Sequence, residues 1–291
     1  MFSVVITHFN RPDSLLRCLY AIDVSSRLVD EIIVVDNGSC ERNFNEAEKA
    51  VRNVTKAKFI SHPVGNANAA RNAGFKLASS KWICFCDDDD YFSEDKFSVL
   101  AKIITANPNV QVVYNALKVE WFGTSFGYVT NPSAPSIKMN YRDFVFNRLG
   151  STSGLTIEKD LLQSVGGFDE RLNSLQDYEL YIRLALNEAS LWLTNRPLTF
   201  YYKGLSSGQV SSGVDRLKES LIYIEKKHSF LVSSDVADIY SAWKERLIFQ
   251  KEVDSGIKLH KIFTYRRVGL RYKLVCYGRR SLMRVVRCFI Q

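Results

Sequence analysis

Short apolar runs alternate with amphipathic stretches along the first 106 residues of the chain. The runs are rich in β-branched and aromatic residues and predict buried strands over residues 2–7, 31–35, 57–60 and 81–86. Apolar residues at helical spacing predict helices from Pro12, up to about Val54, over 66–78 and over 93–106. Alternating helices and continuous apolar strands are typical of a doubly wound, mostly parallel α/β sheet with helices on both faces.

The pattern continues with shorter elements beyond residue 110. Strands are predicted over 110–119 and 155–157, separated by a loop over 123–140 that is rich in Gly, Ser, Pro and Asn. Helices are predicted over 158–165 (ended by Gly166 and Gly167), from Asp177 onward, over 215–227 and over 237–250.

Four consecutive aspartates, residues 87–90, follow the fourth predicted strand. Adjacent carboxylates repel one another when ionised, and a bound divalent cation is the simplest compensation. Residues two apart in an extended chain point the same way, so we expect Asp87 and Asp89 to face one cation and Asp88 to turn away. So few oxygen ligands suit Mg²⁺ or Mn²⁺ that also binds water and a phosphate substrate. The alternative is a solvated acidic turn before a helix capped by Ser93.

Three polar turns follow predicted strands, at residues 7–11, 36–39 and 87–90. Ligands of a doubly wound sheet bind beyond the carboxyl ends of its strands, where the strand order reverses. Three turns rich in carboxylate and amide groups at that edge indicate a nucleotide site. The chain contains neither G-x-G-x-x-G nor G-x-x-x-x-G-K-[ST], which disfavours the ordinary dinucleotide and P-loop sites.

The composition is that of a globular chain, since 46% of the 291 residues are hydrophobic and 24% are charged. The net charge of +8 is uneven: residues from Ser255 onward hold ten Lys or Arg and no acidic residue, which leaves −2 for the first 254. Bases mixed with apolar residues over 258–291 indicate a segment attracted to an anionic membrane surface. A solvated basic tail and a nucleic-acid-binding segment are the alternatives, and we expect no nucleic acid partner.

The six cysteines form no C-x-x-C pair, and none has a nearby His at zinc-site spacing. The first residues lack the basic start of a signal peptide, and no run reaches the ~18 apolar residues of a membrane span. We therefore expect a protein of a reducing cytosol.

Six short motifs occur together over residues 1 to about 185. They are VVITHFNR (4–11), VVDNGS (34–39), ARNAG (70–74), DDDD (87–90), GGFDE (166–170) and QDYEL (176–180). In this order and spacing the chain resembles the family 2 glycosyltransferases, which are inverting enzymes of the GT-A fold common in bacterial polysaccharide assembly. A weaker match continues to Ser211, followed by Lys227 and His228.

The resemblance implies roles for individual residues. It implies nucleotide-sugar contacts from Thr7, Phe9, Asn10, Arg11, Asp36, Arg71, Asp87 and Asp88. It further implies that Asp89 and Asp87 hold Mn²⁺ or Mg²⁺ and that Asp177 is the general base. Gln176 stands where the family usually has Glu. Many relatives carry a His in the loop beside Lys203, where this chain has none, so Lys203 becomes the candidate contact for the diphosphate.

The resemblance also implies an activity and a layout. The activity is metal-dependent transfer of a hexose or N-acetylhexosamine from a UDP-sugar to a polyprenyl-diphosphate-linked or other lipid-linked saccharide. It would serve O-antigen or capsule synthesis at the cytoplasmic face of the bacterial inner membrane. The layout is a GT-A domain over 1–214, with a nucleotide-sugar-binding half (1–115) and an acceptor half (116–214), and a helical, basic extension over 215–291.

Two other readings stay open at this stage. A sugar nucleotidyltransferase also uses paired aspartates and Mg²⁺ on a doubly wound sheet, but it needs a glycine-rich, basic phosphate loop where this chain has residues 8–12. A non-catalytic membrane- or nucleic-acid-binding protein on the same scaffold would tolerate changes at Asp89 and Asp177.

Overall fold

A computed structural model describes residues 1–24, 26–63, 65–121, 127–130, 137–138, 149–203, 213–255 and 268. Within these ranges the strands are β1 Phe2–His8, β2 Val29–Asp36, β3 Ala57–Ser61, β4 Trp82–Asp87, β5 Tyr91–Phe92, β6 Val112–Trp121, β7 Gly127–Val129, β8 Ile137–Lys138, β9 Leu155–Glu158 and β10 Ser190–Lys203. The helices are α1 Pro12–Val24, α2 Glu41–Arg52, α3 Ala67–Leu77, α4 Lys96–Ala106, α6 Lys159–Ser164, α7 Gln176–Leu186, α8 Val214–Lys227, α9 Phe230–Ser233 and α10 Ala237–Ser255, with 3₁₀ turns η1 Ser26–Leu28 and η2 Thr152–Gly154.

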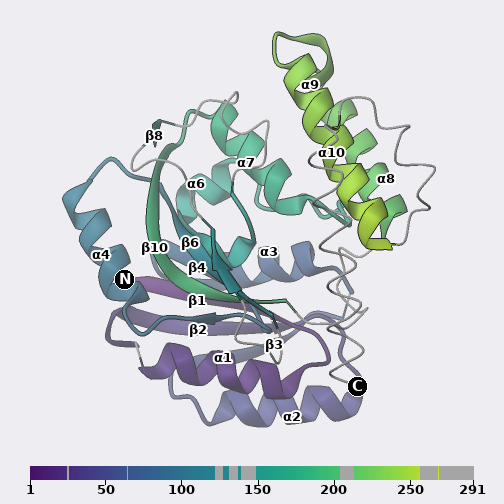
Figure 1. Ribbon diagram of the computed structural model, residues 1–291. Helices are drawn as coiled ribbons and strands as arrows, with labels where there is room; N and C mark the ends of the chain where they lie inside the picture. Colours follow the sequence, from purple (N-terminus) through teal and green to yellow (C-terminus); the bar gives the residue numbers. More distant parts are fainter. Residues whose placement is uncertain are drawn as a thin grey trace.

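One twisted sheet runs through the molecule, with helices on both faces (Figure 1). Among the described strands its order is β3-β2-β1-β4-β9-β6-β10-β5, with β7 beside β6 and β8 beside β10. The pairs β3–β2, β2–β1, β1–β4 and β6–β10 are parallel, whereas β9 runs antiparallel to β4 and β6. The expected α/β fold is confirmed, and its sheet is mixed in the second half.

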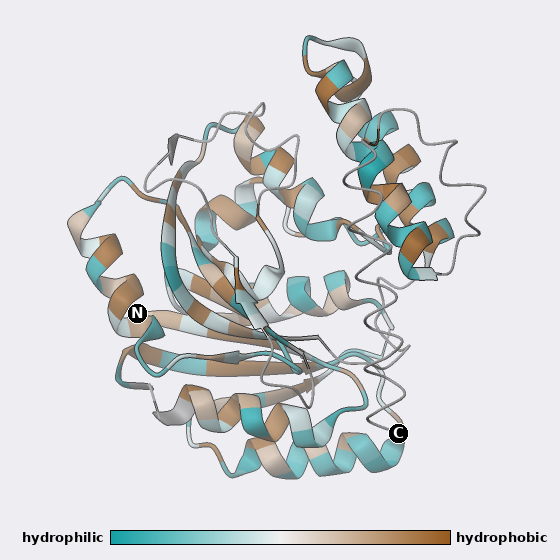
Figure 2. Cartoon of the chain, viewed as in Figure 1, coloured by the Kyte–Doolittle hydropathy of each residue, from teal (hydrophilic) through white to brown (hydrophobic). Residues whose placement is uncertain are grey.

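The two faces of the sheet carry separate apolar cores. One core joins the sheet to α1, α2 and α4, and the other joins it to α3, α6 and α7. Figure 2 shows the consequence, because hydrophobic colour gathers along the strands while the outward side of α2 is hydrophilic. Burial on both faces explains why the first strands are continuous apolar runs.

The strand order reverses between β1 and β4. From β1 the chain first builds outward through β2 and β3, then returns to place β4 on the other side of β1. Here α1 and α2 cover one face, and α3, which leads back to β4, covers the other. Ligands of such sheets bind in a crevice at the carboxyl ends of the strands beside this reversal. The three polar turns predicted from the sequence all lie at this edge.

The first four strands and their helices confirm the sequence predictions to within a few residues. Pro12 is the first residue of α1, as its fixed backbone angle favours. The side chain of Asn66 caps α3 by accepting from the N–H groups of Asn68 and Ala69 at 2.9 and 3.2 Å. Gly166 and Gly167 follow α6 with φ of +85° and +70°, which glycine adopts without strain.

Several features differ from the predictions. The loop predicted over 123–140 includes the short strands β7 and β8, and β5 was not predicted. The helix predicted from residue 93 begins at Lys96, and Ser93 does not cap it, because its hydroxyl donates to the carboxylate of Asp95 at 2.8 Å. The strand β10 was missed. Its sequence contains Pro197, which usually excludes a central strand, and the structure tolerates it where the register with β6 shifts.

The helices α8, α9 and α10 stand beside α7, away from the sheet (Figure 1). They share a third apolar cluster with it, in which Tyr178 and Ile182 of α7 pack with Ile224, Leu231 and Tyr240. The basic segment 258–291 lies outside the described residues apart from residue 268, so its predicted role stays a prediction. In the described part of the chain, no helix combines the length and apolar character that crossing a membrane requires.

The contact of α3 with the sheet yields a stability prediction. A Cβ added at Gly74 would lie 2.4 Å from Cγ1 of Val5 and 3.2 Å from Cγ2 of Val35. Helix propensity favours Ala over Gly by about 1 kcal/mol, but the overpacking should outweigh it, so Gly74→Ala should lower the free energy of unfolding by about 1–3 kcal/mol. Urea unfolding measures the change. As a control, Gly213→Ala adds a Cβ that meets the flexible Arg216 side chain at 3.6 Å, and it should cost only the smaller preference for Gly over Ala at the N-cap of α8. A loss as large as that of Gly74→Ala would contradict the packing argument.

Candidate active site

The carboxyl ends of β2, β1 and β4 bring three polar turns side by side. In the parallel ladders, His8 pairs with Asp36 and Thr7 pairs with Asp87. The hydroxyl of Thr7 donates to Asp87 Oδ1 at 3.3 Å, which joins the ends of β1 and β4 directly. Residues far apart in the sequence thus meet at the point where the strand order reverses.

The four aspartates after β4 alternate in exposure. The side chains of Asp87 and Asp89 are 27% and 25% exposed, whereas Asp88 is fully buried and Asp90 is 1% exposed. The exposure is as the sequence predicted, but the reason differs, because residues 88–89 form a turn in which the N–H of Asp90 donates to the carbonyl of Asp87 at 3.0 Å. Asp87 and Asp89 are therefore the two carboxylates of the turn that can reach a ligand.

Two arginine side chains already form ion pairs with the carboxylates of this acidic turn. Arg71 of α3 pairs with Asp87 at 2.6 Å, and Arg11 pairs with Asp88 at 2.6 Å and also with Asp89. Burial disfavours ionisation of Asp87, but Arg71 outweighs it and holds the pKa of that carboxyl below its ordinary value. Charge crowding by itself thus does not demand a bound cation.

Asp89 is less well compensated. Burial, together with the neighbouring charges of Asp87 and Asp88, raises the pKa of Asp89 to about 6 even though Arg11 opposes the shift. A carboxylate in this position would gain from a further positive charge. Asp89 is thus the member of the turn best suited to a cation.

Asp88 serves the turn after β1. Its Oδ2 lies 2.8 Å from His8 Nδ1 and accepts from the N–H of Phe9 at 3.0 Å. With the Arg11 pair, these contacts use both oxygens of a buried carboxylate. His8 is likewise fully buried. The side chain of Asp88 thus connects the end of β4 to the predicted nucleotide turn after β1.

The turns after β1 and β2 are bonded to each other. Asn10 adopts φ of +55°; its N–H donates to Ser39 Oγ and its Oδ1 accepts from the N–H of Cys40, both at 2.8 Å. Asp36 Oδ2 accepts from the N–H groups of Gly38 and Ser39, each at 3.1 Å. Backbone and side-chain bonds thus hold both turns open at one edge.

Two groups at this edge could contact a ligand. Asp36 Oδ1 is buried and has no hydrogen-bond donor among the described residues. The ring of Phe9 is 46% exposed, although the backbone of Phe9 is held by Asp88. A buried free acceptor beside an exposed aromatic ring is suited to a planar, hydrogen-bonding ligand.

Arg71 lies deeper than a simple ligand contact. Its side chain is 5% exposed and its guanidinium sits 5.6 Å from the ring centre of Phe168 in the GGFDE motif. Because Arg71 also pairs with Asp87, it links the acidic turn to the loop that leads to α7.

Asp177 lies at the start of α7, which packs on the same face of the sheet as α3. Asp177 is partly exposed, and its Oδ1 accepts from the N–H of Tyr178 at 2.8 Å. Burial raises the pKa of Asp177 to about 6, opposed by Arg71 and supported by Asp87. Because the charges of Arg71 and Asp87 both act on it, Asp177 lies near the end of β4.

The structure adds residues that the motifs did not reveal. Ser153 Oγ accepts from the N–H of Asp87 at 3.1 Å. Behind it, the fully buried Lys96 donates to Ser153 O at 3.1 Å and to Thr199 Oγ1 at 2.9 Å. The sequence showed GSTSG at 150–154 and a Lys after the acidic run, but neither signal tells which group it meets.

Tyr201 of β10 is a further residue that the motifs missed. It lies on the same side of the strand as Thr199, two residues earlier, which touches Ser153. Burial raises its pKa, and the carboxylates of the acidic turn and Asp177 add to the shift. Tyr201 therefore lies within range of the charges of both the acidic turn and Asp177.

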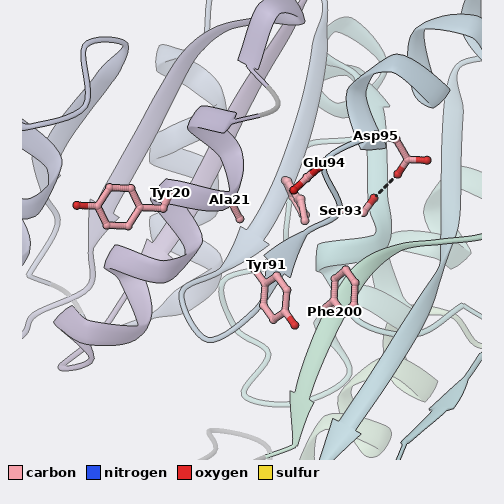
Figure 3. A pocket seen from close by; sticks show the side chains of 8 residues that line it. Tyr20, Ala21, Tyr91, Ser93, Glu94, Asp95 and Phe200 are labelled. Carbon is pink, nitrogen blue, oxygen red and sulfur yellow. Dashed lines mark hydrogen bonds between the residues drawn. The ribbon is translucent and has the colours of Figure 1, made fainter.

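A cavity of about 630 Å³ lies on the flank, between α1, β5 and α4 (Figure 3). Its aromatic walls, Tyr91 and Phe200, stack on each other with ring centres 4.5 Å apart. Arg17 lies 5.5 Å from the Tyr91 ring centre and Lys118 lies 5.0 Å from that of Phe200. Because each ring is covered on both faces, this cavity offers no free ring from that pair on which a sugar could stack.

The side chains at the acidic turn suit a divalent cation that prefers oxygen ligands. Within the described ranges, no three His, Cys, Asp or Glu side chains come together as a complete metal site. Asp87 and Asp89 supply two oxygen donors at the edge of the crevice. Such a set suits Mg²⁺ or Mn²⁺ that takes its other ligands from water and phosphate oxygens, and does not suit zinc.

Comparison with known proteins identifies the family. The sequence model described as Glycosyl transferase family 2 matches residues 3–164, more than half of the chain. The chain belongs to this family. The match covers β1 to α6, and therefore includes the turns at Asp36 and the acidic run, and the helix α3 that carries Arg71.

Several glycosyltransferases resemble this family 2 chain. An uncharacterized glycosyltransferase of Haemophilus influenzae is 27% identical over 235 residues, covering 78% of this chain and 77% of its own. The amylovoran biosynthesis glycosyltransferase AmsB of Erwinia amylovora is 25% identical over 265 residues, covering 86% and 85%. The chain is thus a glycosyltransferase.

A solved structure supports the fold. Residues 1–349 of S. aureus TarS, crystallised in complex with UDP-GlcNAc, superpose with a TM-score of 0.64 at 18% identity, covering 93% of this chain and 82% of that one. The likeness confirms the GT-A type of fold that the sequence motifs of this glycosyltransferase indicated.

The different positions of Asp88 and Asp89 generate a prediction. Asp88→Asn removes one carboxylate oxygen from a buried set of three partners and should lower the free energy of unfolding by about 1–3 kcal/mol. Asp89→Asn neutralises a crowded, partly exposed carboxylate and should change it by less than about 0.5 kcal/mol. Urea unfolding at pH 7.5 with EDTA compares the two. Equal losses, or a larger loss for Asp89→Asn, would refute the structural role of Asp88.

Proposed function

We propose that this family 2 glycosyltransferase transfers a hexose or N-acetylhexosamine from a UDP-sugar to a lipid-linked saccharide, inverting the anomeric carbon. The proposal rests mainly on one observation. The strand-end turns that hold Asp36, Asp87 and Asp89 lie near Asp177, at the start of α7. A donor-binding edge and a carboxylate base near it are the two parts that a single displacement needs.

The turns after β1 and β2 form the proposed nucleotide site. Asp36 Oδ1, which has no partner in the described part of the chain, would accept a hydrogen bond from an N–H or O–H group of the nucleoside. The exposed ring of Phe9 would pack against the base, with Thr7, Asn10 and Arg11 shaping the turn beneath it. The UDP-GlcNAc complex of TarS supports UDP as the nucleotide.

Asp87 and Asp89 would hold Mn²⁺ or Mg²⁺ at the diphosphate. The ion supplies stabilisation of the negative charge that develops on the departing diphosphate. The protein's own part is to present the two carboxylates in fixed positions, which it does through Arg71, Asp88 and Ser153.

Asp177 is the proposed general base. It would accept the proton of the acceptor hydroxyl as the hydroxyl oxygen attacks the anomeric carbon and the bond to the diphosphate breaks. A carboxylate whose pKa is raised to about 6 is a stronger base than an ordinary aspartate and is still mostly ionised at neutral pH. Within the described residues no cation pairs with it, so the carboxylate is available.

Two observations support a lipid-linked saccharide as the acceptor: the polymer named for one relative, and the basic segment 258–291. AmsB serves amylovoran biosynthesis, which supports a saccharide acceptor in polymer assembly. The basic, apolar segment 258–291 would attach the enzyme to the anionic cytoplasmic face of the inner membrane, where polyprenyl-diphosphate-linked or other lipid-linked acceptors are found. No nucleic acid partner is proposed.

A donor screen tests the proposal. UDP release is measured from a panel of UDP-sugars with Mn²⁺, with Mg²⁺ and with EDTA, for the wild type, Asp89→Ala, Asp177→Asn and the exposed control Asp160→Asn. We expect metal-dependent release from one sugar, kept in the control and lowered about 100-fold or more in the two site variants. No release from any UDP-sugar and no thermal shift with UDP would overturn the UDP assignment.

The raised pKa of Asp177 predicts a pH profile. Since the base must be deprotonated, the rate at saturating substrate and metal should rise tenfold per pH unit at acidic pH and level off above about pH 6. UDP affinity, measured over the same pH range, separates protonation of Asp177 from protonation of Asp89. A rate that stays flat down to pH 4.5 while UDP remains bound would contradict the role of Asp177.

A further inference from the structure

A single lysine joins two buried carboxylates beside the proposed base. Lys227, the last residue of α8, lies 2.6 Å from Asp169 Oδ2 and 2.8 Å from Glu179 Oε1. Glu179 is fully buried on α7, and the Asp169 side chain, in the GGFDE loop before α7, is 6% exposed. One ammonium group thus ties the loop, α7 and α8 together.

Glu179 and Asp169 each have further hydrogen-bond partners besides Lys227. Glu179 receives Arg183 in a forked pair at 2.8–3.0 Å and lies 3.0 Å from His228 Nε2. Asp169 accepts the hydroxyl of Tyr223 at 2.8 Å. Burial disfavours ionisation of Glu179, but His228 and Arg183 outweigh it and hold its pKa at about 2.

Apolar packing surrounds this ion cluster. Tyr178, which precedes Glu179, packs against Trp243 of α10 with ring centres 4.6 Å apart, and Trp243 lies 5.7 Å from Tyr240. Apolar burial presses α7 against the C-terminal helices but has little directional preference. The ion cluster has strict geometry, and buried ion pairs are better suited to fixing an arrangement than to adding stability.

The cluster and the proposed base sit on one helical turn. Asp177 and Glu179 are two residues apart, so their side chains point about 200° apart around the helix axis. Asp177 therefore faces the crevice while Glu179 faces α8. Leu175, the residue before α7, has a left-handed backbone with φ of +59°, so the start of the helix needs support from outside.

We propose that Lys227 is a positioning residue that sets the placement of Asp177 through Glu179 and Asp169. This inference rests on the proposed role of Asp177 as the base. It makes the C-terminal helices a part of the catalytic apparatus. Helix α8 binds the side of α7 that carries Glu179, whereas Asp177 lies on the other side of α7. Lys227 itself touches neither the donor edge nor the acidic turn.

The test compares two lysines of α8 that both form ion pairs. Lys227→Met removes the shared ammonium group and keeps most of the side-chain length. Lys218→Met is the matched control, because Lys218 pairs with Glu252 of α10 at 2.9 Å and does not contact α7. Lys227→Arg keeps the charge and can still reach two carboxylates. The full-length protein is used throughout.

Three readouts separate positioning from general stability. We expect Lys227→Met to lower kcat about 10- to 100-fold, since a displacement near 1 Å costs on that order. The Kd for UDP should change less than twofold, and backbone amides of α7 should exchange hydrogen faster. Lys218→Met should leave kcat and the exchange of α7 unchanged, and Lys227→Arg should recover most of the kcat.

Each other outcome overturns the inference. An unchanged kcat with unchanged exchange in α7 would show that Lys227 does not position the helix. Equal loss of kcat in Lys218→Met would show that the effect is one of bundle stability. If the wild type releases no UDP from any donor, the proposed function fails, while the hydrogen exchange of α7 in Lys227→Met still decides whether the lysine holds the helix.

Discussion

Compensation of carboxylates that are buried at the end of β4 is the constraint on which the donor side depends. A carboxylate as deeply buried as Asp88 needs partners for both oxygens, because an unpaired buried charge is severely destabilising. All its partners come from the turn after β1. The same requirement brings Arg71 from α3 to Asp87, and Lys96 from α4 into the field of Asp90. The turn after β1, α3 and α4 thus each bring a cation to the acidic turn, and the protein itself holds that turn in shape.

The second half of the sheet brings the remaining parts to the same edge. β9 inserts antiparallel between β4 and β6, so that η2 before it reaches the end of β4 and Ser153 can accept from the backbone of Asp87. β10 then pairs along β6 and carries Thr199 and Tyr201 toward the acidic turn. The crevice is therefore lined by strands from both halves of the chain.

The helix α7 separates two cores. One side of it packs on the sheet through Leu180, Tyr181 and Leu184, and the other packs on α8 and α10 through Tyr178 and Ile182. A helix buried on both sides has little freedom to shift, and its first turn carries the partly exposed Asp177. The helices predicted from residue 215 onward therefore share an apolar cluster with α7. The segment beyond residue 255 differs from them by its strongly basic sequence.

Local pattern was enough to determine the first half of this molecule. Continuous apolar strands, Pro12, Asn66 and the glycines after α6 each act within a few residues, so β1 to β4 and their helices could be read directly from the sequence. Six motifs in register identified the family. β10 escaped, because Pro197 is tolerated only where the register with β6 shifts, and that depends on a distant strand. Only the tertiary structure decided that Asp88 faces the turn after β1, that Lys96 lies behind Ser153 and that Lys227 joins Asp169 to Glu179. Ion pairs across a sheet or between helices are set by which side chains approach within a few ångströms, and sequence spacing carries no record of that distance.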